Sequence, residues 1–259
     1  DEDTLIYHSD DGASFHFPAP SVGQAFSHPI QQSLSVQRAE QGYLVQWRNG
    51  PTHCFDAITP QHARLTAIVD RNHNRLDFHY NETGSLTEVR QSGGAQLKVD
   101  STQGRITRIS LVHRNGELTP IARYNYHANG TLAQFVNSSG RPFKFDYDAD
   151  GRLTRWEDRN GKWYAYHYDD QGRAVRTESS GNSLVGTLEY DTSTRTTHLT
   201  NSQGHQEHYT HDESLRLICK IDAAGGITTY EYNQFDQKTR ETGPTGAVTE
   251  WCYDEQGNL

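Results

Sequence analysis

Short stretches in which aromatic and polar residues alternate recur along most of the chain. Residues 143 to 147, Phe-Lys-Phe-Asp-Tyr, are a clear example. Alternation with a period of two is typical of a strand that packs one face against apolar neighbours and turns the other to water. No stretch shows a helical period flanked by capping residues. The pattern therefore predicts an all-β chain of short strands.

One motif returns at regular intervals. Tyr147, Asp148, Gly151 and Arg152 reappear as Tyr168, Asp169, Gly172 and Arg173. His211 stands at the tyrosine position of a degenerate copy, in which Leu215 replaces the glycine. A repeated spacing fixes architecture, so each copy is one unit of the same fold. The tyrosine positions, most of them 21 residues apart, are Tyr80, Val99, Tyr126, Tyr147, Tyr168, Tyr190, His211, Tyr232 and Tyr253.

Each unit contains two glycine-marked turns. Both kinds follow residues rich in Asp and Asn, whose side chains cap turns, while glycine accepts a positive φ. A unit is therefore expected to be strand, turn, strand, turn, and the chain a string of antiparallel hairpins. The glycines four residues after the tyrosine position are Gly84, Gly130, Gly151, Gly172 and Gly257, and those seven before it are Gly140, Gly161, Gly204, Gly225 and Gly246.

The second strand of each unit carries apolar residues three apart, such as Leu153 and Trp156. In an ideal strand these two positions face opposite sides. Either a β-bulge intervenes or both faces are partly covered. The sequence leaves these two alternatives open.

The repeats are predicted to occupy residues 55–259, because one further copy can be aligned with its tyrosine position near Phe55. Residues 1–54 are predicted to form a less regular β region. Hairpin-like stretches run there from Tyr7 to Phe17 and from Tyr43 to Phe55. The motif begins again at Tyr253, so we expect the sequence to be a piece of a longer polypeptide.

The Tyr-Asp-x-x-Gly-Arg repeat resembles the YD repeat of rearrangement-hotspot (Rhs) proteins, which the C component of toxin complexes and, more distantly, teneurins share. The resemblance covers about residues 55–259. It implies a long sheet that spirals into a hollow β-cocoon around a C-terminal toxin domain. The implied partners are the rest of the shell, the enclosed toxin and secretion spike proteins. Synthesis in the bacterial cytoplasm and export, often by type VI secretion, are implied as well.

Composition leaves the predicted fold class unchanged and adds expectations about the core and the partners. Only 33% of residues are hydrophobic, yet the chain has 14 Tyr, 9 Phe and 4 Trp. We therefore expect a folded, thin, aromatic-rich structure rather than one thick core. A net charge of −9 without a basic cluster argues against nucleic acid as a partner. No apolar run approaches the roughly 18 residues that span a membrane, so no membrane partner is predicted.

Candidate chemistry is sparse. Residues 205 to 211, His-Gln-Glu-His-Tyr-Thr-His, are the most metal-like stretch, but their spacing differs from HExxH and only some of them share a strand face. His53 and Cys54 are adjacent, which would place them on opposite strand faces. The prediction is that the chain has no catalytic residues, metal site or cofactor and is not an enzyme.

Two other functions stay open at this stage. The repeated rings could form a glycan-binding surface of a cell-surface adhesion module, provided that they are exposed. A metallohydrolase centred on residues 205 to 211 is the third hypothesis. We favour a shell segment whose ring rows hold a thin sheet together through cross-strand pairs.

Overall fold

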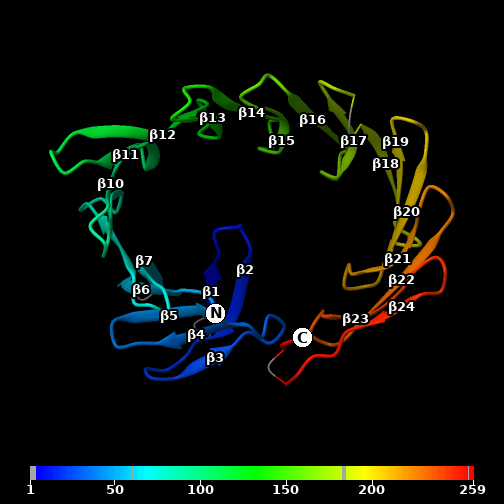
Figure 1. Ribbon diagram of the computed structural model, residues 1–259, viewed down its shortest axis with the longest axis horizontal. Coiled ribbons are helices and arrows are strands. Elements are labelled where there is room, and N and C mark those ends of the chain that lie inside the picture. Colours follow the sequence, from blue (N-terminus) through cyan, green and yellow to red (C-terminus); the bar gives the residue numbers. More distant parts are fainter. Residues whose placement is uncertain (1–3, 60, 183–184, 256) are drawn as a thin grey trace. The chain divides into compact units, whose positions relative to one another are not determined.

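The computed structural model describes residues 4–59, 61–182, 185–255 and 257–259. These residues form β-strands, turns and irregular segments, and no helix. None of them therefore forms a helix long and apolar enough to cross a membrane. The chain divides into two compact units, one of Asp1–Ile121 with Tyr253–Leu259 and one of Ala122–Cys252 (Figure 1).

The first unit contains a hairpin and a sheet. β1 pairs with β2 apart from the rest, and the strands from β3 to β11 pair in chain order, each antiparallel to the next. The strands are β1 (Thr4–His8), β2 (Ser14–Pro18), β3 (Ala25–Ser27), β4 (Leu34–Arg38), β5 (Gly42–Trp47), β6 (Thr52–Thr59), β7 (His62–Val69), β8 (Arg75–Tyr80), β9 (Leu86–Gln91), β10 (Gln96–Thr102) and β11 (Arg105–Val112).

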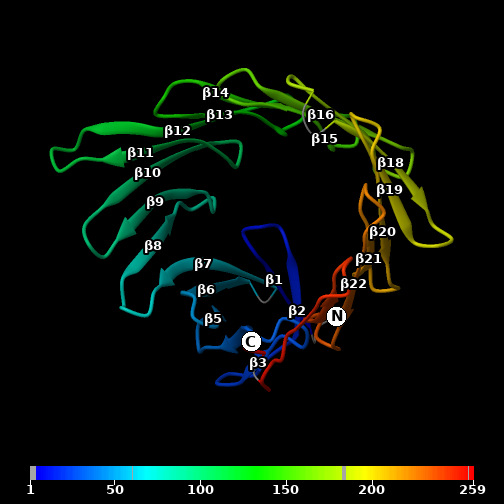
Figure 2. The same ribbon diagram turned by 45° about the vertical axis from the view of Figure 1, so that its right-hand side comes forward.

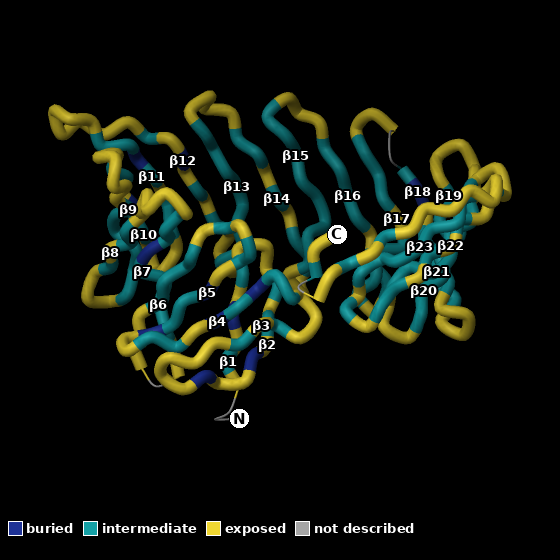
Figure 3. Tube along the Cα trace, turned by 60° about the horizontal axis from the view of Figure 1, so that its bottom comes forward, coloured by how far each residue is buried: buried dark blue, intermediate teal, exposed yellow. Residues whose placement is uncertain are grey.

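The hydrophobic core of this unit lies where the β1–β2 hairpin packs on the sheet. Phe17 from β2 is 1% exposed and meets Leu34 and Val36 from β4, both fully buried. Figure 3 shows buried segments in dark blue among the strands from β1 to β5. Tyr7 and Val45 complete the buried cluster. Burying such side chains stabilises the fold by about 1.5–3 kcal/mol each. The N-terminal region is therefore the best-packed part of the chain that the structure describes.

The second unit is a continuous antiparallel meander. β12 (Leu118–Tyr126) begins before the boundary at Ala122 and pairs with β13 through Ala122 to Tyr126. The strands that follow pair in chain order from β13 to β24 (Figure 2). They are β13 (Leu132–Asn137), β14 (Pro142–Tyr147), β15 (Leu153–Glu157), β16 (Trp163–Tyr168), β17 (Ala174–Ser179), β18 (Gly186–Asp191), β19 (Thr196–Asn201), β20 (Gln206–His211), β21 (Leu217–Ile221), β22 (Ile227–Tyr232), β23 (Lys238–Thr242) and β24 (Val248–Glu250).

The all-β string of antiparallel hairpins predicted from the sequence is thus confirmed. The open question about the second strands is also resolved. Tyr147 pairs with Leu153 and Asp146 with Arg155, so Thr154 is an extra, bulged residue. Because of this bulge, Leu153 and Trp156 lie on the same face of the sheet, with Trp156 opposite Phe145. The same shift in register recurs at Tyr80, Tyr126, Tyr168, His211 and Tyr232.

Strand register sorts the side chains of β12 to β17 onto two unlike faces. We call one of them the aromatic face. Cross-strand pairing and alternation along each strand place on it the rings of Tyr124, Phe135, Phe143, Phe145, Trp156, Tyr164, Tyr166 and Tyr168. We call the opposite face the ionic face. It carries Lys144, Arg155, Glu157, His167, Arg176 and Glu178, and Trp163 lies there under the Arg155 guanidinium.

Candidate functional site: the clamp between repeats

The site is built on the turn that follows each motif tyrosine. In the turn after Tyr147, the Asp148 carboxylate accepts hydrogen bonds from the backbone N–H groups of Asp150 at 3.0 Å and Arg152 at 2.9 Å. Its other oxygen accepts a bond from Arg152 Nε at 2.7 Å. Asp169 and Asp212 bind Arg173 and Arg216 in the same way. The aspartate therefore shapes the turn and fixes the arginine at once.

The glycine of the motif provides the backbone conformation that closes this turn. Gly151 and Gly172 have φ of 79° and 78°, a region that side chains with a Cβ seldom adopt. Leu215 holds the same place in the degenerate copy at φ 63° and is 79% exposed. Gly84, Gly130 and Gly257 have φ of 82°, 88° and 79° in their own turns.

The arginine then reaches the next repeat. The Arg152 guanidinium lies over the ring of Tyr168, 5.1 Å from its centroid. Arg173 lies over Tyr190 at 4.5 Å, and Arg216 over Tyr232 at 5.3 Å. Cation–π contacts at such partly exposed sites contribute about 0.5–1 kcal/mol each. Each motif arginine therefore links its turn to the tyrosine one repeat further along the chain.

The tyrosine hydroxyl makes a second contact, a hydrogen bond back to the preceding repeat. Tyr168 donates a hydrogen bond to the carbonyl of Leu153 at 2.6 Å, directly after the arginine that covers its ring. Tyr190 donates to Ala174 at 2.7 Å and Tyr232 to Leu217 at 2.8 Å. In the first unit, Tyr80 donates to Leu65 at 2.7 Å while Arg64 lies over its ring at 4.6 Å. We call this combination the repeat clamp.

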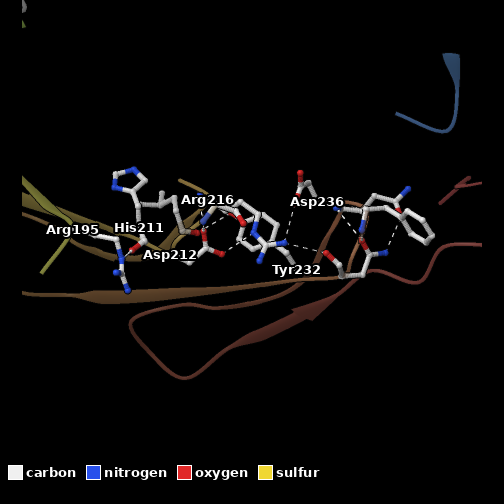
Figure 4. A network of polar contacts seen from close by, with 11 residues as sticks. Arg195, His211, Asp212, Arg216, Tyr232 and Asp236 are labelled. Atoms are coloured by element: carbon white, nitrogen blue, oxygen red, sulfur yellow. Dashed lines mark hydrogen bonds and ion pairs between the residues drawn. The ribbon is translucent and has the colours of Figure 1, made fainter. Parts of the chain in front are cut away.

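Figure 4 shows the clamp around Tyr232 at close range. Asp212 holds Arg216, which lies over the Tyr232 ring. Arg216 also donates to the carbonyl of Asn233 at 3.2 Å and to the Asp236 carboxylate at 2.9 Å. One arginine therefore joins the motif turns of two successive repeats.

Burial and hydrogen bonding shift the pKa values of these groups away from reactive ranges. Burial raises the pKa of Tyr147, Tyr168 and Tyr232, so their hydroxyls stay protonated and able to donate. The backbone N–H of Arg173 lowers the pKa of Asp169, and that of Arg216 lowers the pKa of Asp212. Neutral tyrosines and ionised aspartates are the states that the clamp requires.

The remaining predicted motif residues occupy related positions. Tyr126 and Tyr147 lie beside register shifts, and the His127 ring packs edge-on against Tyr147 at 6.2 Å. His211 lies opposite Leu217, the place that Tyr147 holds opposite Leu153. Tyr253 lies after the last strand, in the segment that belongs to the first unit.

The placement of Val99 needs correction. The register shift of β10 lies between Asp100 and Ser101, and Ser101 pairs with Ile106. Ser101 therefore holds the tyrosine position of this copy. Val99 lies two residues earlier and is 5% exposed. A buried apolar residue at this place fits the same sequence pattern as a buried ring, so the pattern alone does not separate Val99 from a motif tyrosine.

The clamp itself was not predicted. The sequence contains a signal for it, because Arg64, Arg152 and Arg216 each stand 16 residues before a motif tyrosine. Leu65 and Leu153 likewise stand 15 residues before Tyr80 and Tyr168. These spacings report contacts between neighbouring units rather than turns within one.

The stretches considered for chemistry show other arrangements. Tyr209 donates a hydrogen bond to Glu207, and Lys220 lies 3.5 Å from the same carboxylate. No three His, Cys, Asp or Glu side chains converge into a metal-binding group within the part of the chain that the structure describes. His53 lies 3.3 Å from the Tyr7 hydroxyl, and burial raises the pKa of the Cys54 thiol. A raised pKa leaves this thiol a poor nucleophile.

Residues 53–200, more than half of the chain, match the family described as Teneurin YD-shell. The chain belongs to this YD-shell family. Its resemblance to the repeat shell of Rhs proteins is thereby confirmed, and the repeats of a YD-shell are structural. No curated protein matches the sequence.

The solved structures that share the fold of this YD-shell chain include two that contain TcdB2 and TccC3. The crystal structures of TcdB2-TccC3-TEV and TcdB2-TccC3 each align with a TM-score of 0.57, at 9% and 10% identity. Each alignment covers 98% of this chain and 18% of the other. The chain therefore spans less than a fifth of the length of the chains it matches, and at this identity the likeness is one of fold.

Proposed function

We propose that this YD-shell chain is a wall segment that encloses a C-terminal toxin domain for export. The observation that supports this most directly is the unlike character of the two faces of the sheet from β12 to β17. The eight rings that define the aromatic face are all half-buried, and Ala122 and Gly186 are the buried residues of this unit among those described. A continuous row of half-buried rings with little buried core behind it is an apolar surface of the kind that contacts another chain.

The ionic face has the character of a solvated surface. Lys144 lies 2.8 Å from the Glu157 carboxylate, and Arg155 lies 3.3 Å from it. Arg176 binds Glu178 at 2.9 Å. Such exposed pairs add little stability but keep a sheet face soluble. In the proposed shell, the aromatic face lines the inside and the ionic face meets water.

The proposed setting follows the family resemblance. The segment would be made in a bacterial cytoplasm and exported with its toxin, by type VI secretion with spike proteins or by a similar route. The wall would act by steric exclusion, with no catalytic residue of its own. The likeness to the TcdB2-TccC3 structures supports the shell fold on which this setting rests.

The glycan-binding alternative receives less support. Sugars stack on open ring faces, but the faces here are covered by neighbouring rings. Phe143 stacks on Phe145 and on Trp156, with ring centroids 5.1 and 5.4 Å apart. Trp156 stacks in turn on Tyr164 at 6.0 Å. The rings form a continuous row that stabilises the sheet.

Limited proteolysis of the natural full-length polypeptide tests the proposal. The segment that follows the repeats should be cleaved at least about tenfold more slowly in the full-length protein than when it is expressed alone, because the wall excludes the protease. Tyr164→Lys on the aromatic face should reduce this protection, whereas the matched change Ala165→Lys on the ionic face should leave it intact. Equal cleavage rates with and without the repeats would refute enclosure.

A further inference from the structure

We propose that His198 and His208 bind one divalent transition-metal ion, which ties β19 to β20. The two histidines are direct cross-strand partners on neighbouring antiparallel strands. Their rings face each other with centroids 4.7 Å apart, and the Nδ1 atoms are 2.5 Å apart. Both residues are half-buried. This site lies on a sheet face and requires none of the residues of the repeat clamp.

The geometry of the pair is close to that of two ligands of one ion. Zinc binds histidine nitrogen at about 2.0–2.1 Å, so two nitrogens of a tetrahedral shell stand about 3.3 Å apart. Small ring rotations that increase the distance between the two Nδ1 atoms by less than about 1 Å would make room for the ion. Neutral imidazole is a good ligand for zinc, copper and nickel, and Cu²⁺ should bind tightest.

The surroundings suit a cation. His198 pairs on its other side with Glu189 of β18, which places that carboxylate on the same face one strand away. Glu189 is exposed and forms no ion pair in the described part of the chain. Cβ atoms of direct cross-strand neighbours lie about 4.5–5.5 Å apart, so a change of rotamer brings the carboxylate toward the rings. Thr196, Thr200 and Thr210 flank the rings along the strands, so no positive charge opposes the ion there.

The position of the pair in the repeat gives the ion a role. β19 and β20 belong to successive repeats, and the tyrosine position at this junction is His211, which has no hydroxyl to donate to a carbonyl. The arginine contact is also altered, since Arg195 Nε donates to the His211 carbonyl at 3.3 Å (Figure 4). A metal link between His198 and His208 would reinforce the junction at which the repeat clamp is degenerate.

No third His, Cys, Asp or Glu converges on the rings within the described residues, so the site has two protein ligands, with water completing the shell. Glu189 is the further ligand that a rotamer change would recruit. Cys219 lies on the same face, since it pairs with Thr210. It is displaced along the strand from His208 and is not required.

Calorimetric titration of the chelator-treated protein with zinc and with copper, near neutral pH, tests the site. We expect one ion per chain. His198→Gln or His208→Gln should weaken binding by about tenfold or more, and Glu189→Gln by less, because it removes an auxiliary ligand. The matched control is His205→Gln, which alters a histidine in the preceding turn and should leave the affinity unchanged. Affinity should fall in acid, because only neutral imidazole binds the ion.

A spectroscopic readout makes the test independent of the variants' folding. The electron paramagnetic resonance spectrum of the wild-type protein with one equivalent of Cu²⁺ should show two coordinating imidazole nitrogens. The proposal is overturned if neither metal binds stoichiometrically, if fewer than two nitrogens bind copper, or if folded His198→Gln and His208→Gln variants bind as tightly as wild type.

Discussion

At the scale of single residues, each part of the motif has a distinct physical role. Asp169 caps the turn and orients Arg173, and Gly172 supplies the positive φ. Arg173 lies over Tyr190, whose hydroxyl donates back to Ala174. The turn roles could be predicted from residue types alone, because they depend on the preferences of Asp and Gly. The roles of Arg and Tyr could not, because they depend on the neighbouring repeat.

Removing one clamp hydroxyl should have a small, measurable cost. Tyr168→Phe keeps the ring under Arg152 but deletes the hydrogen bond to the Leu153 carbonyl. We expect the free energy of unfolding to fall by about 0.5–1.5 kcal/mol, as measured by urea denaturation. Tyr124→Phe is the control, because Tyr124 lies on the same face and makes no such bond in the described residues. Equal losses in both variants would contradict the clamp.

Acid should weaken the turns in a defined pH window. Hydrogen bonds from the Ser193 and Thr194 side chains lower the pKa of Asp191 from 3.8 to about 2. A carboxylate with a lowered folded-state pKa stabilises the fold above its unfolded pKa, and that stability is lost as pH falls through the folded value. The contribution of Asp191 should therefore disappear between about pH 4 and pH 2.

Denaturation midpoints measured across this pH window test whether Asp191 causes the loss of stability in acid. Asp191→Asn should flatten the acid-side decline, because the variant has no carboxylate to protonate. The control Glu82→Gln changes an exposed carboxylate that makes no hydrogen bond in the described part of the chain, and it should leave the decline as it is in wild type. An unchanged decline in Asp191→Asn would exclude Asp191 as its source.

At the scale of elements, the sequence predicts where the strands and turns lie, but it does not predict the register between paired strands. Alternation and glycine spacing place the hairpins. Apolar residues at i and i+3 fit either a β-bulge or a strand with both faces partly covered. The structure shows bulges, at Thr87, Thr107 and Thr154. Two of these threonines donate a side-chain hydrogen bond to the facing strand, Thr87 to His79 and Thr107 to Asp100, both at 3.1 Å. Bulge position depends on the partner strand, so a single strand's sequence does not determine it.

The degenerate turn at Leu215 offers a stabilising substitution. Leu215 holds φ 63° in a place where other repeats use glycine, and its side chain is exposed. The left-handed conformation costs a residue with a Cβ about 1–2 kcal/mol, while glycine adds less than about 1 kcal/mol of unfolded-state entropy. Leu215→Gly should therefore raise Tm in a calorimetric scan. The reverse change in an intact turn, Gly172→Leu, should lower it, and a lower Tm for Leu215→Gly would contradict this account of the turn.

At the scale of the molecule, the two units obtain their stability differently. The first has a packed core around Phe17, Leu34 and Val36, which the sequence did not indicate because it depends on the β1–β2 hairpin packing on a sheet with which it does not pair. The second has no such core among its described residues and is held by ring rows, together with the bulges and repeat clamps that both units contain. A thin, aromatic-rich structure could be predicted from composition. The separation into an aromatic and an ionic face required the register of each strand pair.

Electron cryo-microscopy of the natural full-length protein tests the central claim most directly. The proposed shell predicts that the repeats form a wall whose aromatic face, including Trp156 and Tyr164, contacts density from the segment that follows the repeats. The ionic face, including Lys144 and Glu157, should face solvent. A structure in which the following segment lies outside the repeats, with the aromatic face uncovered or turned to solvent, would contradict the proposal.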